Sequence, residues 1–418
     1  MKIIVAHPAQ QHSYRTAAAL KQEGMLYKYI TTVYNKPFSL TSLCTKFLKG
    51  KLRKKAEARV CAQLDNEDIL QFVELEGLIK LFAMHVTWAK PFYYKINYHT
   101  ADRFAKKVAN YAIKHKVDAV ITYDDSSPLL FEIIKKRAPS IKCILDVSIA
   151  NHLYMRKIFE KDELLAPKFS QRLHDEMPFV WNTQNNIRAI REINSADYFL
   201  VPSLFVKKSL MYSGVKEEQL MICPYGVDAD MFQSKKYEDI ELVKKRPIRY
   251  IFVGGVKERK GAYYLLEAFK QIPKEKAELT IVGTVNTSDE DLQPYLQYVN
   301  FTGMVLHSDV PALLQKSDVY IFPSLAEGLT LSALEAAACG LPLILTENTG
   351  ANDCISDGVE GFIIPAQSVE AIVDKVMWFS EHPEAIEKMG KASRHMAEQY
   401  TWARYGKNLV KVLTEKIN

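Results

Sequence analysis

The sequence predicts an α/β protein built from two doubly wound parallel sheets that face each other. Short apolar runs rich in β-branched residues, such as residues 319–323, have the length of strands buried on both faces. They alternate with longer amphipathic segments, as strands and crossover helices do in a parallel sheet. The chain has 418 residues. This length is too great for one ordinary core and favours two domains of about 200 residues each.

The composition is that of a globular protein without a disulfide framework. Hydrophobic residues make up 48% of the chain and charged residues 25%. The 6 cysteines lack C-x-x-C spacing, which predicts neither disulfides nor a zinc site and indicates a reducing, cytoplasmic compartment. We expect neither a signal peptide nor a membrane-spanning helix, because no apolar run is long enough. The net charge of +6 is compatible with anionic ligands or an anionic membrane surface, and we expect no nucleic-acid partner.

The first domain is predicted at residues 1–225, with strands at 2–6, 27–33, 119–123 and 143–147. Loops after these strands contain polar side chains that belong to the carboxyl edge of the sheet. They are His7, His12, Asp124, Asp125, Asp146 and His152. The two early histidines have no carboxylate or cysteine beside them in the sequence, so metal binding is less favoured for them than a structural role or a role at a binding site.

A basic stretch at residues 45–59 contains seven Lys and Arg residues against Glu57 alone, with Phe47, Leu48 and Leu52 between them. Aromatic and basic residues alternate again at 88–98, from Trp88 and Lys90 onwards. Segments of this kind can lie on an anionic bilayer. A run of charge is also commonly a solvated face, and both interpretations stay open here.

Residues 318–365 contain a strand–loop–helix–strand unit. A strand at 319–323 is followed by a loop at 324–330 and a helix at about 332–339. Gly340 ends this helix and Pro342 prevents its continuation, before a second strand at 343–346. Ligands of such units collect at the carboxyl ends of the strands, so the loop at 324–330 is the predicted binding edge.

Two carboxylates lie at this edge, Glu327 in the loop and Glu335 in the helix, which leans back towards the loop. The amides between them begin the helix without internal partners and can bind an anion: Gly328, Leu329, Thr330 and Leu331. The carboxylates would repel that anion and are expected to serve hydroxyl groups, so a nucleotide-sugar fits the edge. Alternatively, Ser332 and Glu335 form a capping box, which would make Glu335 only a helix cap.

The second domain is predicted at residues 226–400, beginning with a strand at 248–253. The glycine turn after this strand carries Lys257, Arg259 and Lys260 close to a helix start, where they can neutralise a diphosphate. Glycine turns with solvated lysines are common, so the turn alone is weak evidence for a diphosphate site. The prediction is stronger because the Glu327 loop belongs to the same sheet. Asp228 and Asp230 form a D-x-D pair, which we interpret as a linker turn and not as a metal site.

The segment FPSLAEGLTLSALEAAACGLP, residues 322–342, closely resembles the E-x7-E segment of the retaining glycosyltransferases of family four. The resemblance extends less densely over residues 195–365. It implies the two-domain GT-B fold and a hexosyltransferase-type enzyme that moves a sugar from a nucleotide-sugar to a hydroxyl acceptor with retention of configuration. No metal or cofactor is implied, and the pathway would be glycan, polysaccharide or glycolipid biosynthesis. A nucleotide-sugar epimerase of the same fold and an inactive nucleotide-sugar-binding subunit are the alternatives.

The resemblance also implies roles for individual residues. Glu327 would contact the donor sugar and Glu335 the donor ribose. Gly255 stands where the family has an arginine, so Arg259 is expected to share with Lys260 the stabilisation of the leaving diphosphate. The remaining candidates for donor binding, including the loop expected to seat the base, are Gly254, Gly255, Gly303, Met304 and Val305.

On the first domain, Gln10, Gln11 and His12 replace the glycines that approach the donor in the family. His152 is the main candidate for an acceptor contact, with Asp146 and His12 beside it, although ordinary packing is favoured for His152. A carboxyl-terminal helix at about 402–417, within a predicted segment 401–418, is expected to return to the first domain. Because relatives often use lipid-linked acceptors, residues 45–59 would place the protein at the inner face of the membrane.

Overall fold

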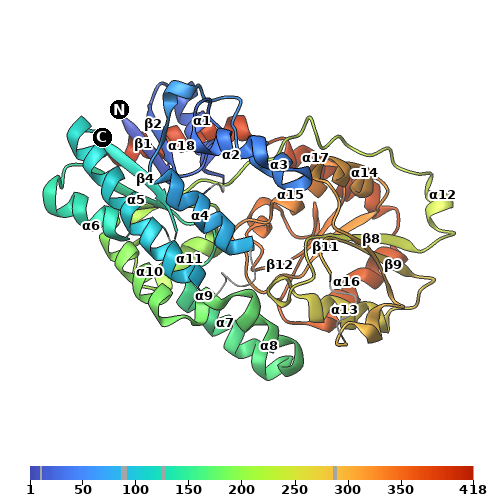
Figure 1. Cartoon of the computed structure of the whole chain (residues 1–418). Coiled ribbons are helices and arrows are strands. Elements are labelled where there is room, and N and C mark those ends of the chain that lie inside the picture. Colours follow the sequence, from blue (N-terminus) through green and yellow to red (C-terminus); the bar gives the residue numbers. More distant parts are fainter. Residues whose placement is uncertain (10–11, 86–91, 125, 127, 286–289, 418) are drawn as a thin grey trace.

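The computed structural model describes residues 1–9, 12–85, 92–124, 126, 128–285 and 290–417. Two parallel sheets lie side by side, each with its own helices, and the two chain ends lie close together on the first domain (Figure 1). The predictions made at Gln10, Gln11 and Asp125, and those at Trp88 and Lys90, fall outside the described residues.

The first domain contains, within the described residues, a seven-stranded sheet in the order β3-β2-β1-β4-β5-β6-β7. All of its neighbouring strands are parallel, and the strand order reverses between β1 and β4. The strands are β1 Ile3–His7, β2 Leu26–Thr31, β3 Ile69–Gln71, β4 Ala119–Tyr123, β5 Lys142–Asp146, β6 Tyr198–Val201 and β7 Leu220–Ile222. β1 and β4 are buried along their whole lengths, as their unbroken apolar sequences predict.

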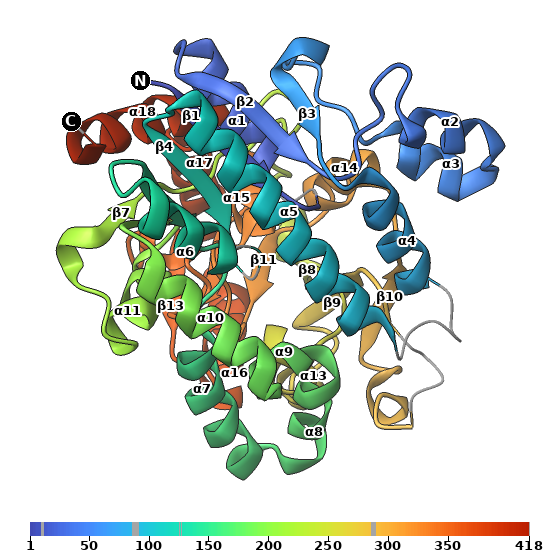
Figure 2. The ribbon, with the colours of Figure 1, turned by 60° about the vertical axis from the view of Figure 1, so that its left-hand side comes forward.

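Two groups of helices in this domain extend beyond the usual crossovers. Between β2 and α5, the helices α2 and α3 extend away from the body of the domain, and α4 packs along α5 (Figure 2). Between β5 and β6, the chain forms α7 to α10. The helices are α1 Ser13–Gln22, α2 Leu40–Phe47, α3 Gly50–Glu57, α4 Glu74–His85, α5 Tyr93–His115, α6 Pro128–Arg137, α7 His152–Leu165, α8 Pro167–Glu176, α9 Pro178–Trp181, α10 Thr183–Ser195 and α11 Leu204–Tyr212. Among the described residues, no helix is both long and apolar enough to cross a bilayer.

The second domain contains, again within the described residues, a six-stranded parallel sheet in the order β10-β9-β8-β11-β12-β13. Its strands are β8 Ile248–Val253, β9 Ala277–Val282, β10 Val299–Gly303, β11 Val319–Phe322, β12 Leu343–Thr346 and β13 Gly361–Ile364. Its helices are α12 Ile240–Val243, α13 Ala262–Gln271, α14 Val310–Gln315, α15 Leu331–Ala338, α16 Val369–Glu381 and α17 Ala385–Ala397, and a short 3₁₀ helix η4 covers Glu258–Lys260. The strand order reverses between β8 and β11, so the loops after these two strands meet at the switch point.

The last helix, α18 Trp402–Ile417, leaves the second domain and packs along α1 of the first. The hydroxyl groups of Thr16 and Tyr405 are hydrogen-bonded across this contact at 2.9 Å. The observed sheets confirm the predicted pair of doubly wound domains. The exact division at residues 225 and 400 stays a prediction.

A buried charge network fixes the amino-terminal edge of the second sheet. Asp318 lies directly before β11 with a side chain that is 3% exposed. Its oxygens lie 3.3 Å from Lys235 Nζ, 2.6 Å from Arg246 Nη1 and 2.9 Å from Arg249 Nη2. Burial acts to raise the pKa of Asp318, but hydrogen bonds from Arg249 and Arg246 and the charge of Lys235 hold this pKa well below its usual range.

Replacing Asp318 with asparagine is therefore expected to lower the free energy of unfolding by about 3 kcal/mol, because three cations lose their buried counter-ion. The lowered pKa of Asp318 also determines how the stability of the fold changes with pH. The stabilisation is fully present above the pKa of an unfolded aspartate, about 3.9, and is lost as the pH falls from there towards the lower folded pKa. Denaturant unfolding at pH 7 and pH 3 checks both statements. Equal stability of wild type and variant at pH 7 would contradict them.

Candidate active site

The loops after β8 and β11 form one unit at the switch point of the second sheet. The carbonyl oxygen of Arg259 in η4 accepts hydrogen bonds from the Leu325 amide and the Ser324 hydroxyl, both at 2.9 Å. At Gly261, φ is +75°, and a Cβ atom there would lie 1.9 Å from the carbonyl oxygen of Pro323. Only glycine allows this approach, so the basic loop and the Glu327 loop are held together.

Arg259 and Glu327 form an ion pair where these loops meet. Arg259 Nη1 lies 2.7 Å from Glu327 Oε1 and also donates to the carbonyl oxygen of Ala326 at 2.8 Å. Both side chains are mostly shielded, with exposed fractions of 13% and 15%. The structure thus joins two residues that the sequence placed in the site separately, one as a phosphate ligand and one as a sugar ligand.

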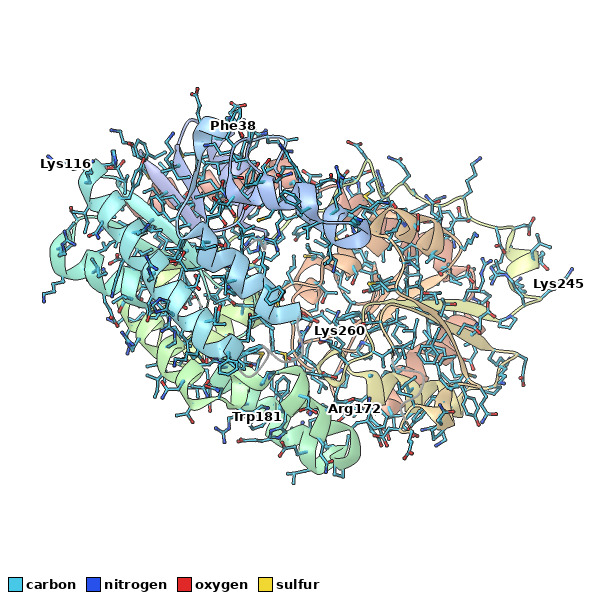
Figure 3. The ribbon with its side chains drawn as sticks, in the orientation of Figure 1. Phe38, Lys116, Arg172, Trp181, Lys245 and Lys260 are labelled. Carbon is cyan, nitrogen blue, oxygen red and sulfur yellow. The ribbon has the colours of Figure 1, made fainter. Side chains whose placement is uncertain are left out.

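Lys260 lies beside this pair at the domain boundary, where Figure 3 labels it. Its Nζ lies 5.3 Å from the centre of the Phe322 ring, and a Cβ on Gly254 would lie 2.8 Å from it. Burial lowers the pKa of Lys260, while the charge of Glu327 raises it. A poorly hydrated ammonium group in this position is a strong potential partner for an anion.

Gly255, where the resembled family has an arginine, faces Thr284. A Cβ at Gly255 would lie 2.6 Å from Thr284 Oγ1. The Val256 amide donates to the Thr284 carbonyl oxygen at 2.9 Å, which keeps the two segments close. A larger residue at Gly255 therefore requires the Thr284 side chain to turn away. In its present conformation, Thr284 occupies the space that an arginine side chain at position 255 would need.

Glu335 is not a helix cap, which corrects the capping-box interpretation. α15 begins at Leu331, and its cap residue Thr330 makes no side-chain capping bond. Ser332 instead donates to the Val253 carbonyl oxygen at 3.2 Å. The Glu335 carboxylate faces the loop after β10, where Oε1 lies 2.9 Å from His307 Nε2. This leaves it directed at the loop predicted to seat the base.

His307 is a residue of the site that the sequence analysis missed. It lies in the loop after β10, and its side chain is 65% exposed. In the same loop Met304 and Leu306 are 77% and 71% exposed. Gly303 has φ +72°, which turns the chain out of the strand. A polar side chain only a few residues after the predicted glycine was the available signal. The loop offers uncovered apolar surface beside a carboxylate and an imidazole.

Gly328 touches the first domain. A Cβ at this position would lie 1.8 Å from the Ser148 carbonyl oxygen, and the Gly328 carbonyl oxygen accepts the Ser203 hydroxyl at 2.6 Å. Among the other predicted anion-binding amides, that of Thr330 donates to the Thr349 carbonyl oxygen at 3.1 Å. Within this loop, the Thr330 amide is therefore already engaged, and the contribution of Gly328, Leu329 and Leu331 stays a prediction.

On the first domain, His12 and Asp146 lie together. His12 Nε2 is 2.9 Å from Asp146 Oδ2, and the Tyr225 hydroxyl donates to Asp146 Oδ1 at 3.5 Å. His12 therefore has a carboxylate partner that its sequence neighbours do not reveal. His7 accepts the Ala9 amide at 3.1 Å, and burial lowers its pKa to about 3, so it is neutral at physiological pH.

His152 is the first residue of α7 and is buried, with its ring centre 4.9 Å from that of Phe179. Both roles considered for His152, packing and acceptor contact, stay predictions. Asp228 Oδ1 accepts the Met231 amide at 3.1 Å, as expected in a linker turn. Among the described residues, no three His, Cys, Asp or Glu side chains are grouped closely enough to hold a metal ion.

Part of the chain, including this site, is similar to known proteins. Residues 233–396, which lie in the second domain, match the family model of the glycosyl transferases group 1. The chain is 26% identical over 205 residues to a D-inositol 3-phosphate glycosyltransferase of Paenarthrobacter aurescens, covering 46% of this chain and 50% of that protein. It spans about half the length of the curated relatives it matches.

Solved structures with low sequence identity share the whole fold. Sucrose-phosphate synthase from Thermosynechococcus elongatus superposes with a TM-score of 0.67 at 16% identity, covering 99% of this chain and 98% of that one. Anabaena HepE in complex with UDP-glucose superposes with a TM-score of 0.61 at 14% identity, covering 99% and 100%. The predicted GT-B fold is confirmed.

Proposed function

We propose that this protein is a glycosyltransferase that moves a sugar from a nucleotide-sugar donor to a hydroxyl acceptor, with retention of configuration, in the synthesis of a glycan, polysaccharide or glycolipid. One observation carries the proposal: Arg259, Lys260 and Glu327 meet at the switch point, while Glu335 faces the loop after β10. Cations for a diphosphate are thus flanked on both sides by carboxylates for hydroxyl groups.

The donor would lie along these groups in a fixed order. The base would rest on the loop of Gly303, Met304 and Val305, with Glu335 accepting hydrogen bonds from the ribose. The diphosphate would meet Lys260 and Arg259, and the sugar would contact Glu327. Arg259 is close enough to Glu327 to hold the Glu327 carboxylate in place for its contact with the sugar. The same arginine would also face the phosphate. Negative charge that develops on the leaving diphosphate would be stabilised by these cations.

In the proposed reaction, the bond between the anomeric carbon and the diphosphate oxygen breaks, and a bond to the acceptor oxygen forms on the same face. The acceptor proton passes to the leaving phosphate, so no protein base is needed. The acceptor would enter from the first domain, near His12 and Asp146, with His152 as a further candidate contact. Some related proteins are described with UDP, UDP-glucose or GDP-mannose, which supports a nucleotide-sugar donor without selecting its base or sugar.

The test is a thermal-shift screen of UDP-, GDP-, ADP- and dTDP-sugars, followed by an assay of the donor that stabilises the protein most. We expect stabilisation by one donor class, transfer to an added acceptor, and the same activity in the presence of a chelator. Conversion of the donor alone into an epimer would identify an isomerase. Binding without transfer or hydrolysis, across a panel of glycan and lipid-linked acceptors, would identify an inactive binding subunit. Loss of activity in chelator, restored by Mg²⁺ or Mn²⁺, would overturn the metal-free proposal.

We also propose that the protein contacts an anionic membrane through a surface formed by α2, α3 and α4, here called the α2–α4 surface. Five of the predicted basic residues, Lys46, Lys49, Arg53, Lys54 and Lys55, are exposed, and large apolar side chains beside them are exposed as well. Phe38 and Phe47 stand out, with exposed fractions of 106% and 80%, and Figure 3 labels Phe38 at the outer edge of the first domain. The other apolar members are Leu40, Leu43, Leu52, Leu75, Ile79, Phe82 and Met84.

Exposed apolar side chains in such number on neighbouring helices are unusual for a surface that faces only water. The neighbouring lysines Lys46, Lys49, Lys54 and Lys55 are exposed and complement anionic headgroups. This combination is the one expected for a surface that lies in the headgroup region and inserts aromatic side chains below it. Such an orientation would present the first domain to a lipid-linked acceptor.

Reversing Lys46, Lys49, Lys54 and Lys55 to glutamate is expected to weaken binding to vesicles of anionic phospholipid by about a hundredfold or more, since each lysine contributes roughly 1 kcal/mol near such a surface. Vesicle sedimentation at low salt measures this. Reversal of Lys106, Lys107, Lys114 and Lys136, exposed on α5 and α6, is the matched control. Phe38→Ser with Phe47→Ser should also weaken binding, and this loss should persist at high salt. Equal binding by wild type and all variants would leave the surface as a solvated face.

A further inference from the structure

The helices α7 and α8 of the first domain lie against the second domain. Both views show α8 on the side of α13, and α8 contacts η4 (Figures 1 and 2). From α7, Asp162 accepts the Tyr264 hydroxyl at 2.5 Å and the Gln367 side-chain amide at 3.0 Å. Both donors belong to the second domain. The helical connection between β5 and β6 therefore extends from the first domain and contacts the second.

One face of α8 makes its part of this contact. Phe169, Arg172 and Glu176 are spaced i, i+3 and i+7 and so lie on one side of the helix. The Phe169 ring centre lies 5.3 Å from that of Tyr263, and Arg172 Nη2 lies 3.0 Å from Asp291 Oδ2. Figure 3 labels Arg172 at this boundary. Glu176 completes the face at the end of the helix.

Glu176 binds the backbone of η4 with both carboxylate oxygens. Oε1 accepts the Glu258 amide at 2.9 Å, and Oε2 accepts the Arg259 amide at 3.2 Å. Glu176 is the last residue of α8, where the helix dipole disfavours a negative charge. Burial also raises its pKa, and the two amides act against this. The charged form of Glu176 is therefore stabilised by the two amides of the η4 loop, which belongs to the other domain.

The loop from Lys257 to Gly261 is thus held from two sides. Within the second domain, Ser324 and Leu325 bind the Arg259 carbonyl oxygen. Across the domain boundary, Glu176 binds the amides of Glu258 and Arg259. When the domains separate, the second set of bonds is lost. The backbone that directs the Arg259 and Lys260 side chains then loses one of its two supports.

We propose that Glu176 is a positioning residue that sets Arg259 and Lys260 for the donor diphosphate when α8 docks on the second domain. This inference rests on the proposed function of that loop. It makes donor binding and domain docking mutually dependent, because a ligand that favours the positioned loop must also favour the docked domain. The positioning residue and the cations it places belong to different domains, so the site is complete only when they meet.

The direction in which nucleotide affinity changes when Glu176 is removed distinguishes a positioning role of this residue from a purely electrostatic one. Burial raises the pKa of Glu176, and the charges of Lys257 and Arg259 act to lower it. Removing a carboxylate beside these cations would, by charge alone, strengthen the binding of a diphosphate. Positioning predicts the opposite, because the loop would lose its ordered conformation before the ligand arrives.

The test compares Glu176→Ala and Glu176→Gln with wild type by calorimetric titration of UDP, GDP, ADP and dTDP. For the nucleotide that binds wild type, we expect Glu176→Ala to weaken binding by about tenfold or more, the size of a lost charged hydrogen bond. Glu176→Gln, which keeps one acceptor, should lie between them and remains informative if the alanine variant is poorly folded. Glu160→Gln removes an exposed carboxylate from the outer side of α7 and should bind like wild type.

Hydrogen exchange of the peptide that covers residues 254–262 gives a second readout. Exchange should be faster in Glu176→Ala and unchanged in Glu160→Gln. Unchanged or tighter nucleotide binding by Glu176→Ala, or unchanged exchange of this peptide, would overturn the inference alone. Failure of wild type to bind any of the four nucleotides would overturn the proposed function, and this inference with it.

Discussion

Replacing Glu327 with alanine is expected to lower the rate of sugar transfer by about a thousandfold, the upper range for loss of one group that stabilises a transition state. Its carboxylate is the group of this loop that would hold the sugar, and it also fixes Arg259 through their 2.7 Å contact. Nucleoside diphosphate binding should persist or become tighter, because Arg259 is freed to face the phosphate. Transfer rates at saturating donor, with calorimetric titration of the nucleoside diphosphate, measure both effects.

Glu335→Ala supplies the contrasting variant. Its proposed partner is the ribose, so it should weaken the nucleotide itself by about 1–3 kcal/mol. Glu347→Ala, which removes an exposed glutamate after β12, is the control and should leave both binding and transfer unchanged. If Glu335→Ala binds nucleoside diphosphate like wild type, its proposed role is wrong. If Glu327→Ala transfers sugar at the normal rate, the role of Glu327 is wrong.

The local elements of the second sheet could be predicted closely from the sequence. The helix expected at about 332–339 is found at Leu331–Ala338, and the strand expected at 343–346 is found there. Gly340 has φ +79°, the conformation that ends a helix and favours glycine. These features depend on residues close in the chain, such as buried β-branched runs and a glycine stop, and are therefore visible without tertiary information.

The pairing of side chains could not be predicted in the same way. Arg259 and Glu327 were both assigned to the site, but their contact depends on β8 lying next to β11. His12 seemed to lack a carboxylate because Asp146 is distant in sequence. The sheet brings the loops after β1 and β5 to the same edge, where the two side chains meet.

Surfaces formed by several segments were only partly predicted. The basic residues of α2 and α3 were recognised, but the apolar half of the α2–α4 surface is divided between residues 38–52 and 75–84. Residues 167–195 form three separate helices, α8, α9 and α10, and a proline begins each of the first two. No local pattern indicates that α8 docks on the other domain, because Glu176 acts on backbone amides, which every sequence supplies.

Replacing Gly328 with alanine is expected to reduce transfer by about a hundredfold or more, since misplacement of reacting groups by about 1 Å has an effect of this size. The new Cβ would lie 1.8 Å from the Ser148 carbonyl oxygen and 3.3 Å from Ile149 Cα. Both neighbours are backbone atoms, so no side-chain rotation relieves the overlap. The domains must move apart at this point, which also breaks the bond from Ser203 to the Gly328 carbonyl oxygen.

Each domain keeps its own core in this variant, so thermal unfolding should change little while the radius of gyration in small-angle scattering increases. Gly214→Ala is the control, because a Cβ there meets no atom within 4 Å, although φ is +88°. It should lose some stability to backbone strain but keep the wild-type rate of transfer and radius of gyration. Because Glu327, Gly328 and the helix start at Leu331 lie in one continuous segment, domain contact at Gly328 also places the Glu327 carboxylate. Wild-type transfer by Gly328→Ala would show that the reaction does not need the contact between Gly328 and Ser148.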